Sequence, residues 1–193
     1  ALALSGYETH TASDAATADT TGSRVMSTTV VGSGEPALLF VHGVGCAGED
    51  WKAQVAAFSN RYKCITLDLP GHGASSMPAE NSIACLAESV IQAKNESGAN
   101  RIVLVGHSMG GRVIREIYRR SPTNVVGLIF VDVAMYTGNL QDVLDRVNTQ
   151  LAGDHDAYIR SMYAAMLVDG SEPGLRERIV ERGANLDKTL CQA

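Results

Sequence analysis

Residues 101–113, RIVLVGHSMGGRV, are the part of the sequence whose residue types and spacing best fit chemistry. A short apolar run leads into a glycine-rich turn with Ser108 at its middle, and a helical pattern begins at Arg112. A serine on a sharp strand-to-helix turn holds its hydroxyl above the edge of a sheet, where it can attack an acyl group. Glycine two positions before and after it removes side chains that would collide in such a turn. The pattern predicts that Ser108 is a nucleophile; an idle serine in a glycine-rich turn is the alternative.

Two further segments place histidine and glycine directly after strand-like runs. They are His42-Gly43-Val44-Gly45 and Asp68-Leu69-Pro70-Gly71-His72-Gly73. Residues 43–48 also have the G-x-G-x-x-G spacing of a dinucleotide-binding turn, with Asp68 twenty residues beyond the last glycine. A Rossmann-type protein that binds NAD or NADP is therefore an alternative. The dinucleotide-binding hypothesis leaves the serine turn unexplained. For that reason we prefer the hypothesis that Ser108 is a nucleophile.

Alternating strand and helix patterns must position these segments. Strands are predicted at 24–31, 36–41, 62–69, 102–105 and 125–134, and helices at 48–59, 82–97 and 112–120. We expect 24–31 to be an edge strand and 125–134 to be a buried strand. Such alternation predicts an α/β fold, with a mostly parallel sheet covered by helices on both faces.

From Tyr136 onward the pattern is helical only. Apolar faces are formed by Leu140, Val143, Leu144, Val147 and Leu151, and by Tyr158, Ile159, Met162, Tyr163 and Met166, before a third helix at 175–183. We expect these helices to form a lid over Ser108, with Met162 and Met166 binding the substrate in an apolar pocket. We expect His155, in a polar joint between two of them, to be solvated. The predicted organisation is a flexible N-terminal arm at 1–23, a core at 24–135 and a lid or cap at 136–193.

Composition limits the classes of partner. The 193 residues are 45% hydrophobic and carry a net charge of −5 with no basic run, so we expect no nucleic-acid partner. No apolar run is long enough to span a membrane. Four cysteines show no metal-binding spacing, and we expect buried thiols, or disulfides if the protein is exported. The residues Ala1–Gly6 resemble the end of an export signal, which favours a secreted or periplasmic protein.

Together, the three motifs resemble the α/β-hydrolase superfamily, in its esterase-like branch with a helical lid. The resemblance covers about Arg24 to Ala134. It implies that Ser108 is the nucleophile, that the backbone N–H groups of Val44 and Met109 form the oxyanion hole, and that the 68–73 loop is mainly structural. Asp132, which closes the apolar run Leu128–Val131, is a candidate for the catalytic acid. His107 is implied to be a packing residue of the serine turn.

The resemblance also implies features that this sequence does not show. Relatives have further strands after the lid, and a catalytic histidine follows the last of them. We therefore expect a fragment that lacks the C-terminal strands and this histidine. A processed protein completed by a second chain, and a short non-catalytic binding protein, are the alternatives. The implied reaction is hydrolysis of a small carboxylic ester, thioester or amide through an acyl-Ser108 intermediate, with no cofactor and no metal. A sheet that ends at the 125–134 strand would leave this strand as an open apolar edge, and a second chain or a homodimer would complete it.

Overall fold

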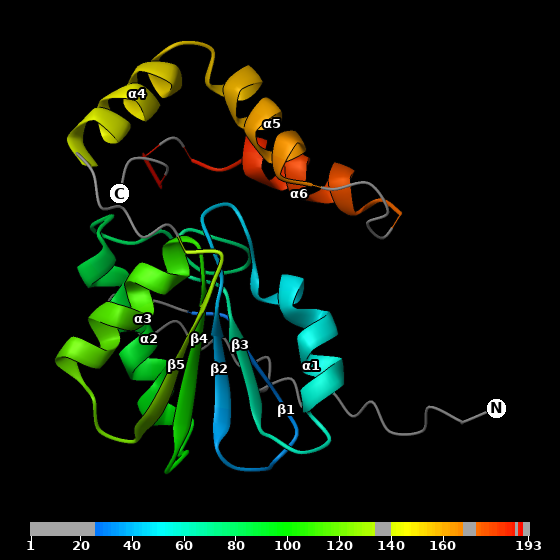
Figure 1. The fold of residues 1–193 in the computed structure, drawn as a ribbon, viewed down its shortest axis with the longest axis vertical. Coiled ribbons are helices and arrows are strands. Elements are labelled where there is room, and N and C mark those ends of the chain that lie inside the picture. Colours follow the sequence, from blue (N-terminus) through cyan, green and yellow to red (C-terminus); the bar gives the residue numbers. More distant parts are fainter. Residues whose placement is uncertain (1–25, 134–139, 168–172, 188, 191–193) are drawn as a thin grey trace.

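The computed structural model describes residues 26–133, 140–167, 173–187 and 189–190. In this part of the chain five strands form one sheet in the order β1-β3-β2-β4-β5 (Figure 1). They are β1 (Thr28–Val31), β2 (Ala37–Val41), β3 (Cys64–Leu67), β4 (Ile102–His107) and β5 (Val125–Val131). Only the β1–β3 pair is antiparallel. The predicted α/β fold with a mostly parallel sheet is confirmed.

Helices cover both faces of the sheet. On one face lie α2 (Ile83–Glu96) and α3 (Met109–Arg120), whose apolar sides pack on the sheet in the main core. The other face carries the 3₁₀ turn η1 (Gly48–Trp51) and α1 (Lys52–Phe58), packed through Trp51 and Val55. The single helix predicted for 48–59 is thus two short elements. Alternate residues of β2 point into the two cores, as Leu39 and Phe40 do.

A separate helical layer lies across the C-terminal ends of the parallel strands (Figure 1). It consists of α4 (Leu140–Ala152), α5 (His155–Met166) and α6 (Leu175–Ala184), so the predicted helices are present. Leu151, Ile159 and Tyr163 form its buried centre. The expected arm at 1–23 and the expected boundary at 135/136 lie outside the described residues. Within the described residues, no helix combines the length and apolarity that a membrane span requires.

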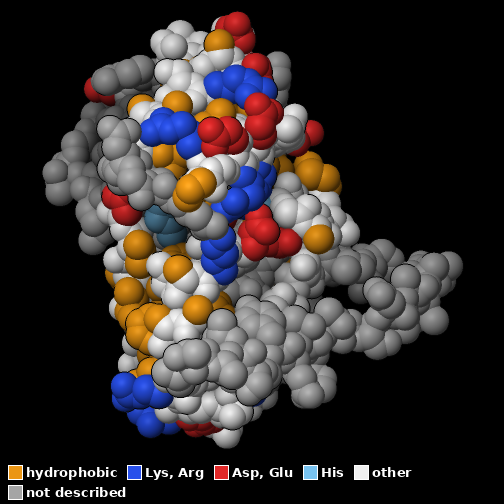
Figure 2. All heavy atoms as spheres, turned by 90° about the vertical axis from the view of Figure 1, so that its right-hand side faces the viewer, with side chains coloured by type: hydrophobic (Ala, Val, Ile, Leu, Met, Phe, Trp, Pro, Cys, Tyr) orange, Lys and Arg blue, Asp and Glu red, His pale blue; other side chains and the backbone are white. Residues whose placement is uncertain are grey.

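The prediction that 125–134 forms a buried strand is wrong, whereas the prediction that the sheet ends at this strand with an open apolar edge is confirmed for the described residues. In the described sheet β5 pairs with β4 alone and is an edge strand. Its side chains Val126, Ile129, Phe130 and Val131 are 37–49% exposed. An apolar sequence cannot by itself distinguish a central strand from an uncovered edge. Figure 2 shows hydrophobic side chains gathered in a band along one side of the core, below a helical layer rich in charged side chains.

Candidate active site

Ser108 sits on a strained turn between β4 and α3. Its φ of 49° and ψ of −118° are rare for any residue but glycine, and it is the N-cap residue of α3. A Cβ added to Gly106 would lie 2.5 Å from the carbonyl oxygen of Gly110, and one added to Gly110 would overlap the carbonyl oxygen of Val41. Both glycines of the serine turn are therefore required by the close approach of backbone on either side of Ser108.

The end of β5 supports this turn. The Ser108 N–H donates to the carbonyl oxygen of Val131 at 3.1 Å, and the Gly111 N–H donates to the carbonyl oxygen of Ser108 at 2.9 Å. Asp132 follows directly, at a φ of 47°, with an exposed side chain. The structure thus places the predicted acid at the strand end next to the one that carries Ser108.

The 42–45 loop lies against the serine turn. A Cβ added to Gly43 would be 3.1 Å from the Ser108 Cβ and 2.9 Å from the His107 Nδ1. The Gly43 carbonyl oxygen accepts hydrogen bonds from the His42 Nδ1 at 2.7 Å and from the Cys46 N–H at 3.2 Å. These bonds fix the plane of the Gly43–Val44 peptide, and in a trans peptide the N–H points away from the carbonyl.

Val44 and Met109 hold the two predicted oxyanion donors. No acceptor for the Val44 N–H is found among the described residues. The N–H of Met109, the first residue of α3, has no acceptor within its own helix because the first turn of a helix lacks one. Two backbone donors beside one serine hydroxyl form an arrangement that can stabilise a developing oxyanion.

His42 is structural. It is 1% exposed, and the Leu69 N–H donates to its Nε2 at 2.9 Å, so the ring is neutral with its proton on Nδ1. Burial lowers the pKa of His42 from 6.5 to about 4. Since both ring nitrogens are engaged, His42 links the loop beside Ser108 to the 68–73 loop.

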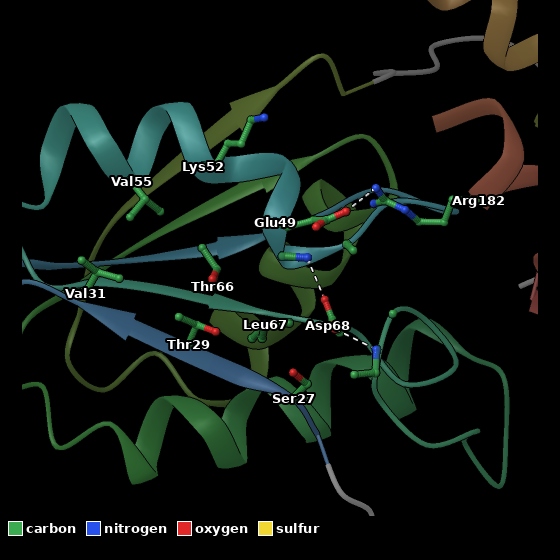
Figure 3. Close-up of a pocket in the computed structure, with 14 residues that line it drawn as sticks. Ser27, Thr29, Val31, Glu49, Lys52, Val55, Thr66, Leu67, Asp68 and Arg182 are labelled. Carbon is green, nitrogen blue, oxygen red and sulfur yellow. Dashed lines mark hydrogen bonds and ion pairs between the residues drawn. The ribbon is translucent and has the colours of Figure 1, made fainter. Parts of the chain in front are cut away.

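The 68–73 loop is held by Asp68. Its carboxylate accepts hydrogen bonds from the Gly48 N–H at 2.8 Å and the Ala74 N–H at 2.9 Å (Figure 3). A Cβ on Gly73 would overlap this carboxylate. The dinucleotide alternative required the same carboxylate for a ribose. Asp68 instead joins the start of η1 to the following loop.

None of the other described histidines is bonded to Ser108. The ring of His107 packs edge-on against Trp51 at 6.5 Å; burial lowers the pKa of His107, and the Asp132 charge opposes this shift. His72 is buried, and its Nδ1 donates to the Pro70 carbonyl oxygen. His155 begins α5 and is 5% exposed, so the expectation of a solvated side chain is wrong.

A cavity of about 200 Å³ lies next to the serine turn. It is lined by His42, Cys46, Asp50, Trp51, Gln54, His107, Val131 and Ile179. The Trp51 Nε1 and the Asp50 Oδ1 are buried without a partner in the described residues. A larger cavity of about 590 Å³ lies between β1, β3 and α1, and none of Ser108, His107 and Asp132 lines it (Figure 3). The smaller cavity is the better substrate candidate because His107 and Val131, the residues directly before Ser108 and Asp132, line it, while Ser108 and Asp132 themselves do not.

Sequence reasoning missed several residues of this cavity and its surroundings. The sequence predicts only a helix around Trp51, at 48–59, and no role for Arg182, which binds Asp50 at 2.6 Å and Glu49 at 2.7 Å. No local pattern in α6 indicates that the side chain of Arg182 reaches η1. Met162 is part of the core of the helical layer, and Met166 is 67% exposed. Neither lines the cavity beside Ser108, and their role in substrate binding stays a prediction.

Cysteine thiols and clusters of possible metal ligands are the remaining reactive groups of the described residues. Cys46 and Cys64 are free, and burial raises the pKa of Cys46 to about 11, which leaves it an unreactive thiol. Cys191 lies outside the described residues. No group of three or more His, Cys, Asp or Glu side chains in the described ranges could hold a metal ion.

Comparisons with known proteins find relatives over part of the chain. An uncharacterised protein of Mycobacterium tuberculosis is 31% identical over 132 residues, which are 68% of this chain and 38% of that protein. The (E)-2-((N-methylformamido)methylene)succinate hydrolase of Acinetobacter baylyi is 37% identical over 83 residues, which are 42% of this chain and 31% of that enzyme. The chain thus spans less than two fifths of the length of these curated relatives.

The fold is shared with solved structures. A thermophilic esterase from Thermogutta terrifontis superposes with a TM-score of 0.74 at 24% identity, covering 91% of this chain and 68% of the esterase. The model of the alpha/beta hydrolase fold family matches residues 36–166, which include the 42–45 loop, the 68–73 loop and the serine turn. The chain therefore belongs to the α/β-hydrolase fold family.

Proposed function

We propose that this chain carries the nucleophile of a serine hydrolase that cleaves small carboxylic esters, thioesters or amides. The observation that carries the proposal is the strained backbone of Ser108 between the 42–45 loop and the N-terminus of α3. Strain of this kind is kept where the surrounding structure requires one side-chain position. We also propose that 24–135 is the catalytic core and that the helical layer of 136–193 is its lid.

In the proposed reaction the Ser108 Oγ attacks the carbonyl carbon of the substrate and loses its proton to a general base. The carbonyl oxygen becomes an oxyanion and accepts hydrogen bonds from the N–H groups of Val44 and Met109. The tetrahedral intermediate collapses to an acyl-Ser108, and the leaving alcohol, thiol or amine takes up the proton. Water then attacks the acyl group and regenerates the serine.

The general base is the missing component. His42 has both ring nitrogens bonded within the fold. His72 is buried with its Nδ1 bonded to the Pro70 carbonyl oxygen, and His155 is buried at the start of α5. His107 precedes the nucleophile and packs on Trp51. We propose that none of these four histidines serves Ser108 and that the base comes from outside the described residues. Asp132 is proposed as the acid that would orient it.

The test is hydrolysis of a short-chain nitrophenyl ester by the 193-residue chain and by Ser108→Ala. Without a base, oxyanion donors and binding alone retain about 10³–10⁴-fold acceleration over water. We expect a weak rate that Ser108→Ala lowers little. Added imidazole supplies a base, and it should raise the rate of the native chain more than that of Ser108→Ala. An ordinary enzymatic rate without imidazole would mean that a histidine of this chain, one of these four or His10, serves Ser108, and it would contradict the expected weak rate. Equal imidazole effects on both proteins would contradict the role of Ser108.

A further inference from the structure

The side chain of Tyr163 connects the helical layer to the 42–45 loop. Tyr163 lies on α5, is 5% exposed, and its hydroxyl donates to the carbonyl oxygen of Val44 at 2.5 Å, across 119 residues of sequence. This is the carbonyl of the same residue whose N–H is the proposed oxyanion donor. The layer thus contacts the donor residue directly.

Two glycines make room for the phenol ring. A Cβ on Gly45 would overlap the Tyr163 hydroxyl, and a Cβ on Gly183, in α6, would overlap the ring carbons. Gly45 has a φ of +67°, a conformation that glycine adopts without strain. The ring therefore fills a slot between the loop beside Ser108 and the helix α6, and any larger residue at either glycine would displace it.

Both peptide planes that flank the Val44 Cα are held, each by a different part of the molecule. The core holds the Gly43–Val44 peptide through His42 and Cys46. The helical layer holds the Val44–Gly45 peptide through Tyr163. Because Gly45 is intrinsically free to rotate, the core alone leaves the second plane weakly restrained. The direction of the Val44 N–H is then set by both groups of contacts together.

We propose that Tyr163 is a positioning residue through which the helical layer aligns the Val44 N–H for catalysis. This inference rests on the proposed function of Ser108 and Val44. If it holds, the oxyanion hole is complete only while α5 is docked on the 42–45 loop. Docking is reinforced beside the loop, where Arg182 of α6 binds Asp50 and Glu49 of η1.

The experiment compares Tyr163→Phe, which removes only the hydroxyl, with Tyr158→Phe on the same helix, whose hydroxyl has no partner in the described residues. The readout is the imidazole-supported, Ser108-dependent hydrolysis of a short-chain ester. Loss of one neutral hydrogen bond corresponds to about a 5- to 10-fold effect. We expect kcat to fall by that factor in Tyr163→Phe with KM little changed, and Tyr158→Phe to behave as the native chain.

A second readout separates alignment from general loosening of the fold. A thionoester carries a longer and weaker-accepting C=S group, so a well-aligned oxyanion hole prefers the oxygen ester. We expect the ratio of oxygen-ester to thionoester rates to fall in Tyr163→Phe. A purely structural role would shift thermal unfolding and leave this ratio unchanged, and that result would overturn the inference.

A third variant displaces the Tyr163 ring and leaves the tyrosine itself unmutated. Gly183→Ala favours the α6 helix by its intrinsic propensity yet pushes a methyl group into the ring. It should reproduce the kinetics of Tyr163→Phe, whereas Gly153→Ala, whose Cβ would meet nothing closer than 3.4 Å, should not. Ser108→Ala runs in parallel. If it retains the rate, the proposed function and this inference both fail; if it loses the rate while Tyr163→Phe matches the native chain, only the inference fails.

Discussion

The backbone N–H of Ser108 donates a hydrogen bond to the carbonyl oxygen of Val131, joining the proposed nucleophile to the last residue of the neighbouring strand. The bond fixes the serine turn relative to the residue that follows Val131, which is Asp132. Two neighbouring parallel strands thus present a serine and a carboxylate at the same edge of the sheet. This is the edge at which open α/β sheets bind their ligands.

The charge of Asp132 acts on His107 in this arrangement. Asp132 favours the protonated ring and raises the pKa of His107 against the larger lowering effect of burial. Asp132→Asn should therefore lower the pKa of His107, as measured by NMR titration of its ring protons. Asp142→Asn, an exposed carboxylate on α4, is the control. An unchanged pKa in Asp132→Asn would show that the two side chains are not coupled.

Acid should destabilise the fold through His42. Its pKa is about 4 in the folded protein and 6.5 when exposed, so the unfolded chain binds more protons between these values. Stability from this group is therefore complete above pH 6.5 and is lost as the pH falls towards 4. The full linkage for a shift of this size is about 3 kcal/mol.

Urea unfolding at pH 7, 5.5 and 4.5 measures this loss. His42→Gln has no titrating ring, and its unfolding free energy should depend less on pH over the same interval. His72 is also buried, and burial lowers its pKa, so His72 adds to the loss of stability in acid. His72→Gln is therefore measured beside His42→Gln, so that the contributions of the two histidines to the pH dependence are separated. Parallel pH profiles for the native chain and His42→Gln would contradict the assignment of a neutral, buried His42.

Two arginines of the helical layer should differ in their effect on stability. The side chains of Arg182 and Asp50 are only 20% and 18% exposed, and Arg182→Ala leaves a largely buried carboxylate without its cation. We expect a loss of about 2–3 kcal/mol, because an unpaired buried charge is costly. Arg160 pairs with Asp156 and Glu181, which are 61% and 59% exposed, and Arg160→Ala should cost much less.

Urea midpoints followed by circular dichroism compare these two variants. The larger shift should belong to Arg182→Ala, and high salt should reduce the effect of Arg160→Ala further. Equal shifts for the two variants would mean that the bond between α6 and η1 contributes no more than a surface ion pair.

The exposed side of β5 leads to a prediction about assembly. Ile129 and Phe130 are 48% and 44% exposed on a strand that pairs only with β4 in the described sheet. We propose that a second copy of the chain pairs along this edge, as open apolar edges do. Ile129→Lys should raise the concentration needed for association by at least about tenfold.

Sedimentation velocity over a range of concentrations tests the assembly. Met77→Lys replaces a side chain that is 52% exposed in the loop after the 68–73 segment, and it should associate as the native chain does. A native chain that remains monomeric throughout the range would contradict the proposed edge pairing.

The parts of this structure that follow from local rules could be predicted from the sequence. The serine turn carries its own signal, because glycine at 106 and 110 is required by backbone contacts within a few residues or one strand away. The order of strands and helices follows from the alternation of apolar runs. Ser82 was included at the start of a predicted helix, and it caps α2 in the structure.

Features that depend on distant contacts could not be predicted in the same way. Tyr163 meets Val44, and Arg182 meets η1, only because the helical layer folds back on the core. The burial of His155 has the same origin, since nothing in its polar neighbourhood indicates that side chains from elsewhere cover it. The exposure of β5 likewise depends on which strands surround it and not on its own residues.

The central claim, that Ser108 is a nucleophile, is tested most directly by the mass of one peptide. Trypsin cleaves after Arg101 and Arg112, and the peptide between them, residues 102–112, contains Ser108 as its only hydroxyl. The folded chain is treated with an alkyl fluorophosphonate at pH 8 with imidazole, digested, and examined by mass spectrometry beside Ser108→Ala. We expect one phosphonyl adduct on residues 102–112 of the native chain, formed faster as the imidazole concentration is raised, and none in Ser108→Ala. An unmodified 102–112 peptide in the folded native chain, or an adduct only on another peptide, would contradict it.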